Sequence, residues 1–181
     1  MAPEPSKTEA ISSRRTRRRI RLAWATFLVF AAFVLVLAER YRMVIVIGSS
    51  MEPTFRSGDV VWADRHAYDT ENPRESDVVV AWVGDQAVLK RVVGLPGQAV
   101  EVRSGIVYVD DEARPSPAPP PAVGMDVERG VLAKDKYAIL GDNRAHSSNP
   151  TIHAIIPKEA IVGRVAGRWS LRPRNERSTG P

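Results

Sequence analysis

The chain has 181 residues, of which 44% are hydrophobic and 26% charged, so it can form one domain of ordinary size with a hydrophobic core. It contains no cysteine, which excludes a disulfide framework, a thiolate zinc site and a cysteine nucleophile. The net charge of +5 belongs to residues 1–21, which hold seven Lys or Arg and two Asp or Glu, and the neutral remainder gives no sign of a nucleic-acid-binding domain.

The N-terminal part of the sequence predicts a basic tail followed by a membrane anchor. Residues 1–13 are polar with no apolar period, so we expect disorder there, and six arginines follow between positions 14 and 21. Residues 22–38 carry no charge, and as a helix this run is about 25 Å long, the short end of what crosses a bilayer core. The positive-inside rule keeps residues 1–21 in the cytoplasm and places the chain after Glu39 on the outer face of the cytoplasmic membrane.

This part of the sequence has two other possible interpretations besides an anchor. A secretory signal peptide could be cleaved after Ala38, but the apolar run is longer than usual for such peptides and strand-like sequence starts almost at once. The arginine block could bind nucleic acid, but no aromatic residue is interleaved with it and no reader fold follows. We therefore predict an uncleaved single-pass anchor over 22–38 and no nucleic-acid partner.

The sequence after residue 43 predicts a mainly β domain over 43–170, because it consists of short β-branched runs separated by Gly-bearing turns, with almost no helical periodicity. Residues 104–105 suggest a hairpin. The segment from about 110 to 136 is Pro/Ala-rich and then polar, so we expect a small surface insertion rather than a core element, and 171–181 is a polar tail. The predicted strands are 43–47, 60–63, 77–83, 87–93, 99–102, 106–109, 136–140 and 160–165.

The first of these runs ends in Gly48, Ser49 and Ser50. A strand that ends in glycine and small hydroxyl residues can present one hydroxyl at a tight bend, because glycine tolerates close backbone approach and positive φ. Ser50 is therefore the candidate nucleophile. A serine hydroxyl is a weak nucleophile at neutral pH, so a base must come from elsewhere in the chain.

The candidate base is Lys90, in the run 88–93. In a strand, the two-residue period places Lys90 on one face with Val88 and Val92, while Arg91 shares the other face with the neighbouring apolar residues. One of the two cations must then sit among apolar side chains. Burial lowers the pKa of a lysine, whereas an arginine stays charged, so only Lys90 can become a base.

Three segments in this order resemble the type I signal peptidases, the Ser-Lys proteases that remove leader peptides from exported proteins. They are the Ser-Met-x-Pro box at 50–53, the Lys-Arg-Val-Val-Gly-Leu-Pro-Gly box at 90–97 and the Gly-Asp-Asn-Arg-x-x-Ser box at 141–147. The resemblance covers about 43–165. It implies a signal-peptidase-like β catalytic domain with a small inserted cap, no metal or cofactor, and preprotein substrates with small residues at the first and third positions before the cut. It also implies a phospholipid membrane as partner and proximity to the secretion translocon.

The resemblance also implies roles for individual residues. Lys90 takes the proton of the Ser50 hydroxyl, and the Ser50 backbone N–H, assisted by the bend at Gly48 and Ser49, holds the oxyanion. Ser147 hydrogen-bonds and orients the lysine. The remaining matches have supporting roles: Met51 packs beneath the nucleophile, and Asp142 and Arg144 tie the turn beside the lysine.

The chain departs from the family pattern at Asn149, Pro150 and Thr151, where the family usually has Asp-Ser-Arg, and more mildly at Gln98. The lost triplet leaves two alternatives open, a narrow-substrate maturation peptidase of the same family and a catalytically silent, membrane-tethered β-module that binds peptides.

A Ser-His-Asp triad or a metal site is disfavoured, because nothing marks a histidine as near Ser50 and no third metal ligand has a recognisable spacing. Self-cleaving repressors with the same dyad are disfavoured because no helix-turn-helix precedes the β region. The three histidines are His66, His146 and His153.

Overall fold

The computed structural model describes residues 7–119, 126–144 and 155–170, with side chains from Arg17 onward. The chain divides into two compact units, residues 1–40 and 41–181. The first unit contains one helix, α1 (Lys7–Arg40), of 34 residues. The helix includes positions 7–13, so the expectation of disorder is wrong for them. Extending an existing helix costs little, and Lys, Glu, Ala and Arg favour the helical state, so α1 continues from the apolar segment into the basic one.

Helix α1 has the length and composition to cross a membrane. Within Arg17–Arg40, an 18-residue window has a mean hydropathy of 2.3, and none of it is buried inside the molecule. The hydroxyl of Thr26 donates a hydrogen bond to the backbone carbonyl of Leu22 at 2.8 Å. The polar atom inside the apolar run is thus satisfied within the helix, as a lipid environment demands.

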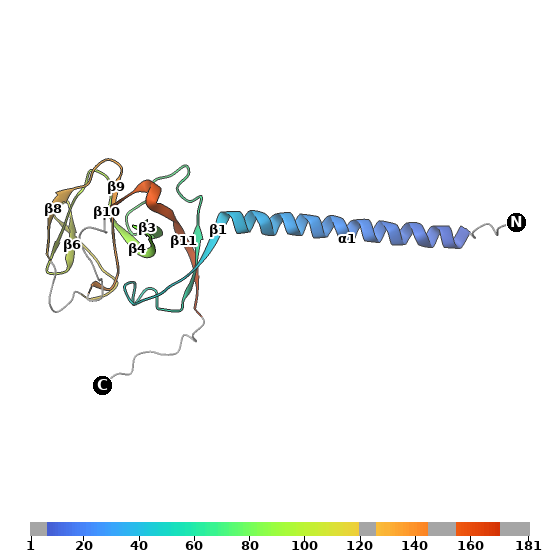
Figure 1. Cartoon of the computed structure of the whole chain (residues 1–181), viewed down its shortest axis with the longest axis horizontal. Helices are drawn as coiled ribbons and strands as arrows, with labels where there is room; N and C mark the ends of the chain where they lie inside the picture. The colour runs from blue at the N-terminus through green and yellow to red at the C-terminus, as the bar shows by residue number, and fades with distance from the viewer. Residues whose placement is uncertain (1–6, 120–125, 145–154, 171–181) are drawn as a thin grey trace, which may run out of the picture. The chain divides into compact units, whose positions relative to one another are not determined.

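The second unit is built from two antiparallel sheets (Figure 1), as the mainly β prediction required. A seven-stranded sheet has the order β1-β2-β11-β3-β4-β9-β10, and a four-stranded sheet has the order β7-β6-β5-β8. A short 3₁₀ helix, η2 (Lys158–Ala160), precedes β11. The strands are β1 (Tyr41–Ile45), β2 (Val60–Asp64), β3 (Val78–Val83), β4 (Gln86–Gly94), β5 (Ala99–Arg103), β6 (Ile106–Val109), β7 (Glu112–Arg114), β8 (Val127–Val131), β9 (Lys136–Leu140), β10 (Ile155–Pro157) and β11 (Ile161–Trp169).

The predicted hairpin at 104–105 is confirmed. Strands β5 and β6 pair from Val100↔Val109 to Arg103↔Ile106, which leaves a two-residue turn. Both turn residues, Ser104 and Gly105, have positive φ, at 48° and 77°. Positive φ at both positions is the requirement of the tight turn that best matches the twist of antiparallel strands.

Part of the core forms where the two sheets pack together. One buried cluster combines Val93, Ala138 and Leu140 of the large sheet with Val102 and Val107 of the small sheet. Figure 1 shows the small sheet, with β6 and β8, on the side of β9. Strands β4 and β9 contribute the large-sheet residues of this cluster, and β4 also carries Lys90.

The segment from 110 to 136 differs from the expected surface excursion. It contains β7, which pairs with β6, and β8, which pairs with β5, while 120–125 lie outside the described residues. Four of the five β8 residues are exposed. A strand at a sheet edge can have both faces in solvent, so it shows no apolar alternation for sequence reasoning to find. Whether this segment acts as a cap stays a prediction.

Candidate active site

The candidate nucleophile lies at the bend that follows β1. Gly48 has a φ of +92°, in the region that glycine enters most readily, as the bend prediction required. The next turn is closed by a hydrogen bond of 2.8 Å from the Phe55 N–H to the Met51 carbonyl. Met51 is buried in a cluster with Val46 and Phe55. This packing fixes the turn and leaves Ser50 at its start, partly exposed.

The three sequence boxes meet at Gly141. The Asn143 N–H donates a hydrogen bond of 2.9 Å to the carbonyl of Ser50. A Cβ atom added to Gly141 would lie 2.4 Å from that carbonyl oxygen and 3.2 Å from Nζ of Lys90. The turn after β9 therefore holds the nucleophile loop and the lysine amine against one residue without a side chain, although the three boxes are far apart in the sequence.

Lys90 lies in the middle of β4, opposite Val79 of β3, and its side chain is half-buried. Val88 and Val92 pack in one cluster and Leu89 in another, as the two-residue period predicted. Burial lowers the pKa of the Lys90 amine, the positive charge of Arg144 lowers it further, and Asp142 opposes both. A lowered pKa increases the fraction of neutral amine, the form that can accept a proton.

Asp142 joins the strand of the lysine to the turn of the serine. Its side chain is 2% exposed, and Arg91 donates to both carboxylate oxygens, from Nε at 2.8 Å and from Nη2 at 2.7 Å. The hydroxyl of Thr54 donates to the same carboxylate. Because Arg91 follows Lys90 and Thr54 belongs to the turn after Ser50, this buried ion pair positions both candidate groups.

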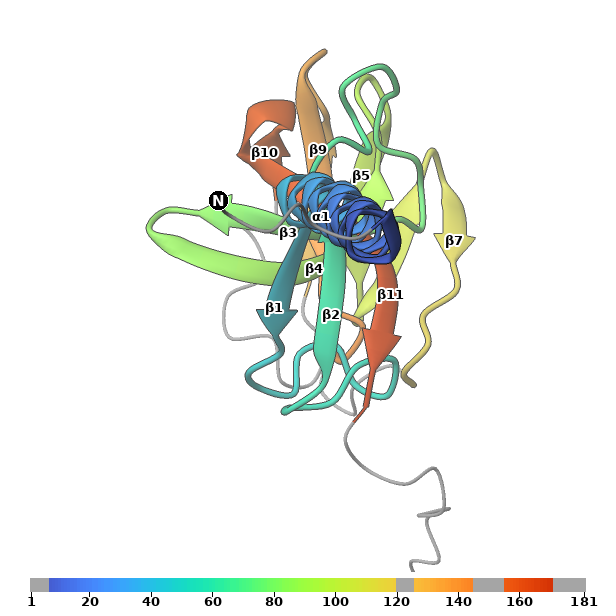
Figure 2. The ribbon, with the colours of Figure 1, turned by 90° about the vertical axis from the view of Figure 1, so that its right-hand side faces the viewer.

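The large sheet ends in an exposed apolar face on β1, β2 and β11. Met43 pairs with Trp62, and Val60 lies between Ile45 and Trp169, so these five side chains share one face. Met43, Ile45 and Trp169 are 57%, 60% and 63% exposed. Figure 2 shows the three strands side by side. A contiguous exposed apolar face of this kind marks an interaction surface.

Comparison with known proteins decides the family. The model of "Signal peptidase, peptidase S26" matches residues 19–170. The chain belongs to the signal peptidase family. It is 32% identical over 136 residues to probable signal peptidase I-2 of Synechocystis sp.. This alignment covers 70% of this chain and 62% of that relative, so the chain spans less than two thirds of the relative's length. It is 25% identical over 169 residues to signal peptidase IB of Staphylococcus aureus, covering 82% and 88%.

A solved structure, the signal peptidase I of Enterococcus faecalis, is 20% identical and superimposes with a TM-score of 0.45 over 52% of this chain and 97% of that chain. Membership of the signal peptidase family confirms the predicted enzyme class, a serine peptidase that hydrolyses peptide bonds.

Several of the predicted site residues lie outside the described part of the chain. Ser147, the expected partner of Lys90, is among them, and so are the divergent triplet 149–151 and two of the three histidines. The third, His66, lies on the surface, where its Nδ1 is 2.7 Å from a carboxylate oxygen of Asp69. Its place in that exposed pair gives no support to a triad.

Sequence reasoning missed two contributions to the site. It assigned no role to Arg91 beyond its face of the strand, although Arg91 binds Asp142. It also expected the Pro-rich segment to be a surface insertion without assigning it a role at the site, whereas the hydroxyl of Ser116 donates a hydrogen bond of 3.2 Å to the Asp142 carbonyl. The adjacent Lys-Arg pair in the second box was the available signal for Arg91. Nothing in the sequence indicated Ser116.

Arg144 follows Asp142 by two residues but makes no ion pair with it. Burial lowers the pKa of the Arg144 guanidinium to about 10, and the positive charge of Arg91 acts in the same direction, against the attraction of Asp142. Its Nε is buried and has no hydrogen-bond partner among the described residues. The turn-tying role expected for both residues therefore fits the contacts of Asp142 but not those described for Arg144.

Proposed function

We propose that this protein is a membrane-bound serine endopeptidase that cleaves N-terminal signal peptides from exported preproteins, with Ser50 as nucleophile and Lys90 as general base. The observation that carries the proposal is the meeting of the Ser50 loop and the Lys90 amine at Gly141. The lowered pKa of Lys90 supports it, because a neutral amine is what the mechanism needs.

The reaction needs only these two groups. Neutral Lys90 accepts the proton of the Ser50 hydroxyl while the oxygen attacks the scissile carbonyl, and the new lysine ammonium then protonates the leaving amine. Water, deprotonated by the same amine, hydrolyses the acyl-enzyme and restores Ser50. The Ser50 N–H donates to no backbone carbonyl within the described residues, so it can donate to the oxyanion.

The substrate is an extended leader peptide with small side chains at the first and third positions before the cut. Relatives that carry the name signal peptidase I support this substrate class. Strand β1 is an edge of the large sheet and runs directly into the Ser50 bend. An extended peptide that pairs with such an edge would be delivered to the nucleophile.

Two features of the structure support membrane binding. They are the apolar span of α1 and the apolar face on β1, β2 and β11. The arginine block before the span supports a cytoplasmic N-terminus and a β unit on the outer face of the cytoplasmic membrane. Preproteins emerge on that face, so the enzyme acts close to the secretion translocon.

The test compares wild type, Ser50→Ala and Lys90→Ala, each purified in detergent, on a synthetic preprotein whose leader ends in Ala-x-Ala. Ser170→Ala and Lys134→Ala are matched controls at exposed positions. We expect cleavage to be lost in the first two variants and kept in the controls. Retained activity in Lys90→Ala would refute the dyad.

A second measurement separates an enzyme from a silent binding module. An acylating serine-protease inhibitor should add its mass to Ser50 of the wild type and not to Lys90→Ala. Acylation without cleavage of the preprotein would identify a peptidase with a narrower substrate range.

A further inference from the structure

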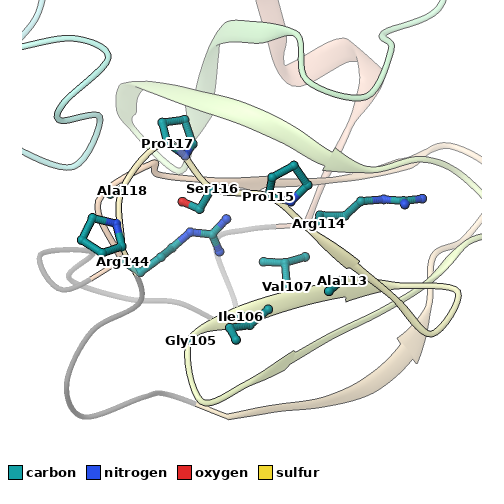
Figure 3. Close-up of a pocket in the computed structure, with 11 residues that line it drawn as sticks. Gly105, Ile106, Val107, Ala113, Arg114, Pro115, Ser116, Pro117, Ala118 and Arg144 are labelled. Carbon is teal, nitrogen blue, oxygen red and sulfur yellow. The ribbon is translucent and has the colours of Figure 1, made fainter.

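A pocket of about 470 Å³ lies between the Pro-rich segment and the small sheet. Ile106 and Val107 of β6 form one wall, and Pro115, Pro117 and Ala118 form the other (Figure 3). These walls are apolar. The volume falls within the range of small-molecule sites.

The charged group in the pocket is Arg144. Figure 3 shows its guanidinium beneath Ser116 and Pro117, whereas the end of Arg114 points away. Arg114 is already paired, with its Nε 2.7 Å from Glu75 and its Nη1 2.8 Å from Glu112. Arg144 has no such partner among the described residues, and its buried Nε donates no hydrogen bond.

Among the described residues, no carboxylate forms an ion pair or a hydrogen bond with this guanidinium. Both carboxylate oxygens of Asp142 are engaged by Arg91, and one of them also accepts from Thr54. The segments that follow the pocket residues in the sequence, 120–125 and 145–154, contain no Asp or Glu. A buried N–H without an acceptor, such as the Arg144 Nε–H, is costly, so an acceptor supplied from outside would be bound favourably.

We propose that this pocket, called here the Arg144 pocket, binds a small carboxylate carried on an apolar body, with the carboxylate hydrogen-bonded to Arg144. The guanidinium fork matches the geometry of a carboxylate. The apolar walls suit a short aliphatic chain and disfavour a fully polar anion such as phosphate. Two sources share this chemistry, a short fatty acid and the C-terminus of a peptide that ends in small residues.

Occupancy of the Arg144 pocket would slow the peptidase, an effect that rests on the proposed function. The charge of Arg144 is one of the causes that lower the pKa of Lys90. A bound carboxylate offsets this charge, so the pKa of Lys90 rises and less of the amine is neutral. The pocket wall is also tied to the site, because Ser116 donates to the carbonyl of Asp142.

Binding is measured first, because it does not depend on activity. The full chain in detergent, labelled with ¹⁵N, is titrated with hexanoate while the arginine Nε–H signals are followed by NMR, and hexanamide serves as the uncharged control. We expect one Nε–H signal, absent in Arg144→Gln, to shift saturably with hexanoate only. Arg129→Gln, which removes an exposed arginine paired with Asp111, should leave the titration unchanged.

A second variant guards against misfolding of Arg144→Gln. Ala113→Phe adds a ring at a pocket-lining position and keeps Arg144, so it should weaken hexanoate binding at least tenfold. Absence of a saturable shift in the wild type would overturn the proposal, and so would equal affinity in the wild type and Ala113→Phe. Acetyl-Ala-Leu-Ala with a free carboxylate, compared with its amide and with hexanoate, distinguishes a peptide source from a fatty acid.

Activity is measured second, as the pH dependence of kcat/KM with and without hexanoate. We expect the rising limb to move to higher pH with hexanoate in the wild type but not in Arg144→Gln, which starts at the higher pH. Binding without any peptidase activity would leave the pocket standing and refute the proposed function. Peptidase activity without hexanoate binding would support the proposed function and refute the Arg144 pocket.

Discussion

At the scale of single residues, the site depends on an absent side chain. Gly141 lies where a Cβ would be 2.4 Å from the Ser50 carbonyl oxygen, a backbone atom that cannot move without moving the nucleophile. Gly141→Ala should therefore lower kcat/KM by about 10²-fold or more, because displacing a reacting group by about 1 Å costs that much. Gly130→Ala is the matched control, since nothing lies within 4 Å of its added Cβ. Equal kcat/KM in the two variants would show that Gly141 does not position Ser50.

The half-buried amine of Lys90 also predicts how stability depends on pH. Its pKa in the folded protein is lowered from the ordinary value of 10.5, so between the two values the unfolded chain binds more protons. The free energy of unfolding should thus rise with pH across this window. Below the pKa of Lys90 in the folded protein, the amine is charged in both states and this gain in stability is absent. Lys90→Met should remove this rise, whereas Lys134→Met, at an exposed position, should keep it. Urea unfolding between about pH 7 and pH 10 measures the difference.

At the scale of elements, the apolar face on β1, β2 and β11 makes a prediction about membrane contact. Trp62 and Trp169 lie on this face, while Trp82 belongs to β3 and is exposed to a similar degree. In bilayers of brominated lipid, we expect single-tryptophan variants that retain Trp62 or Trp169 to be quenched, because bromine quenches only at close range. The variant that retains Trp82 is the control, and one that retains Trp24 in the α1 span reports full quenching. If Trp62 and Trp82 were quenched equally, the face would not be the lipid contact.

The strands show where prediction from the sequence succeeds. The predicted strands are present, most with bounds within one or two residues, because β-branched runs between glycine turns carry the signal directly. Strands β7, β8 and β10 were not predicted. β7 and β10 have three residues each, and most of β8 is exposed, so none shows a period. The candidate dyad could be predicted from its boxes. The partnership of Arg91, Asp142 and Thr54 could not, because it depends on which strands become neighbours.

At the scale of the whole molecule, the candidate site and the predicted membrane anchor belong to different units. Residues 41–181 contain both sheets, the buried clusters and the candidate site at Ser50 and Lys90, while α1 lies in the first unit. Under the proposed function the contribution of α1 is confinement, because it holds the enzyme in the same surface layer as the leader peptide. Confinement raises the effective concentration of the substrate without adding any contact at the site.

This division predicts a selective effect of removing residues 1–40. On a preprotein held in vesicles by its own leader, the shortened chain should be slower by about tenfold or more, because the encounter becomes three-dimensional. On a short water-soluble peptide the two chains should have equal kcat/KM, since the site and its core belong to residues 41–181. The ratio of the two activities, measured on the same preparations, removes errors in active concentration. An equal loss on both substrates would mean that α1 supports the site itself, and no loss on either would mean that the apolar face alone holds the enzyme at the membrane.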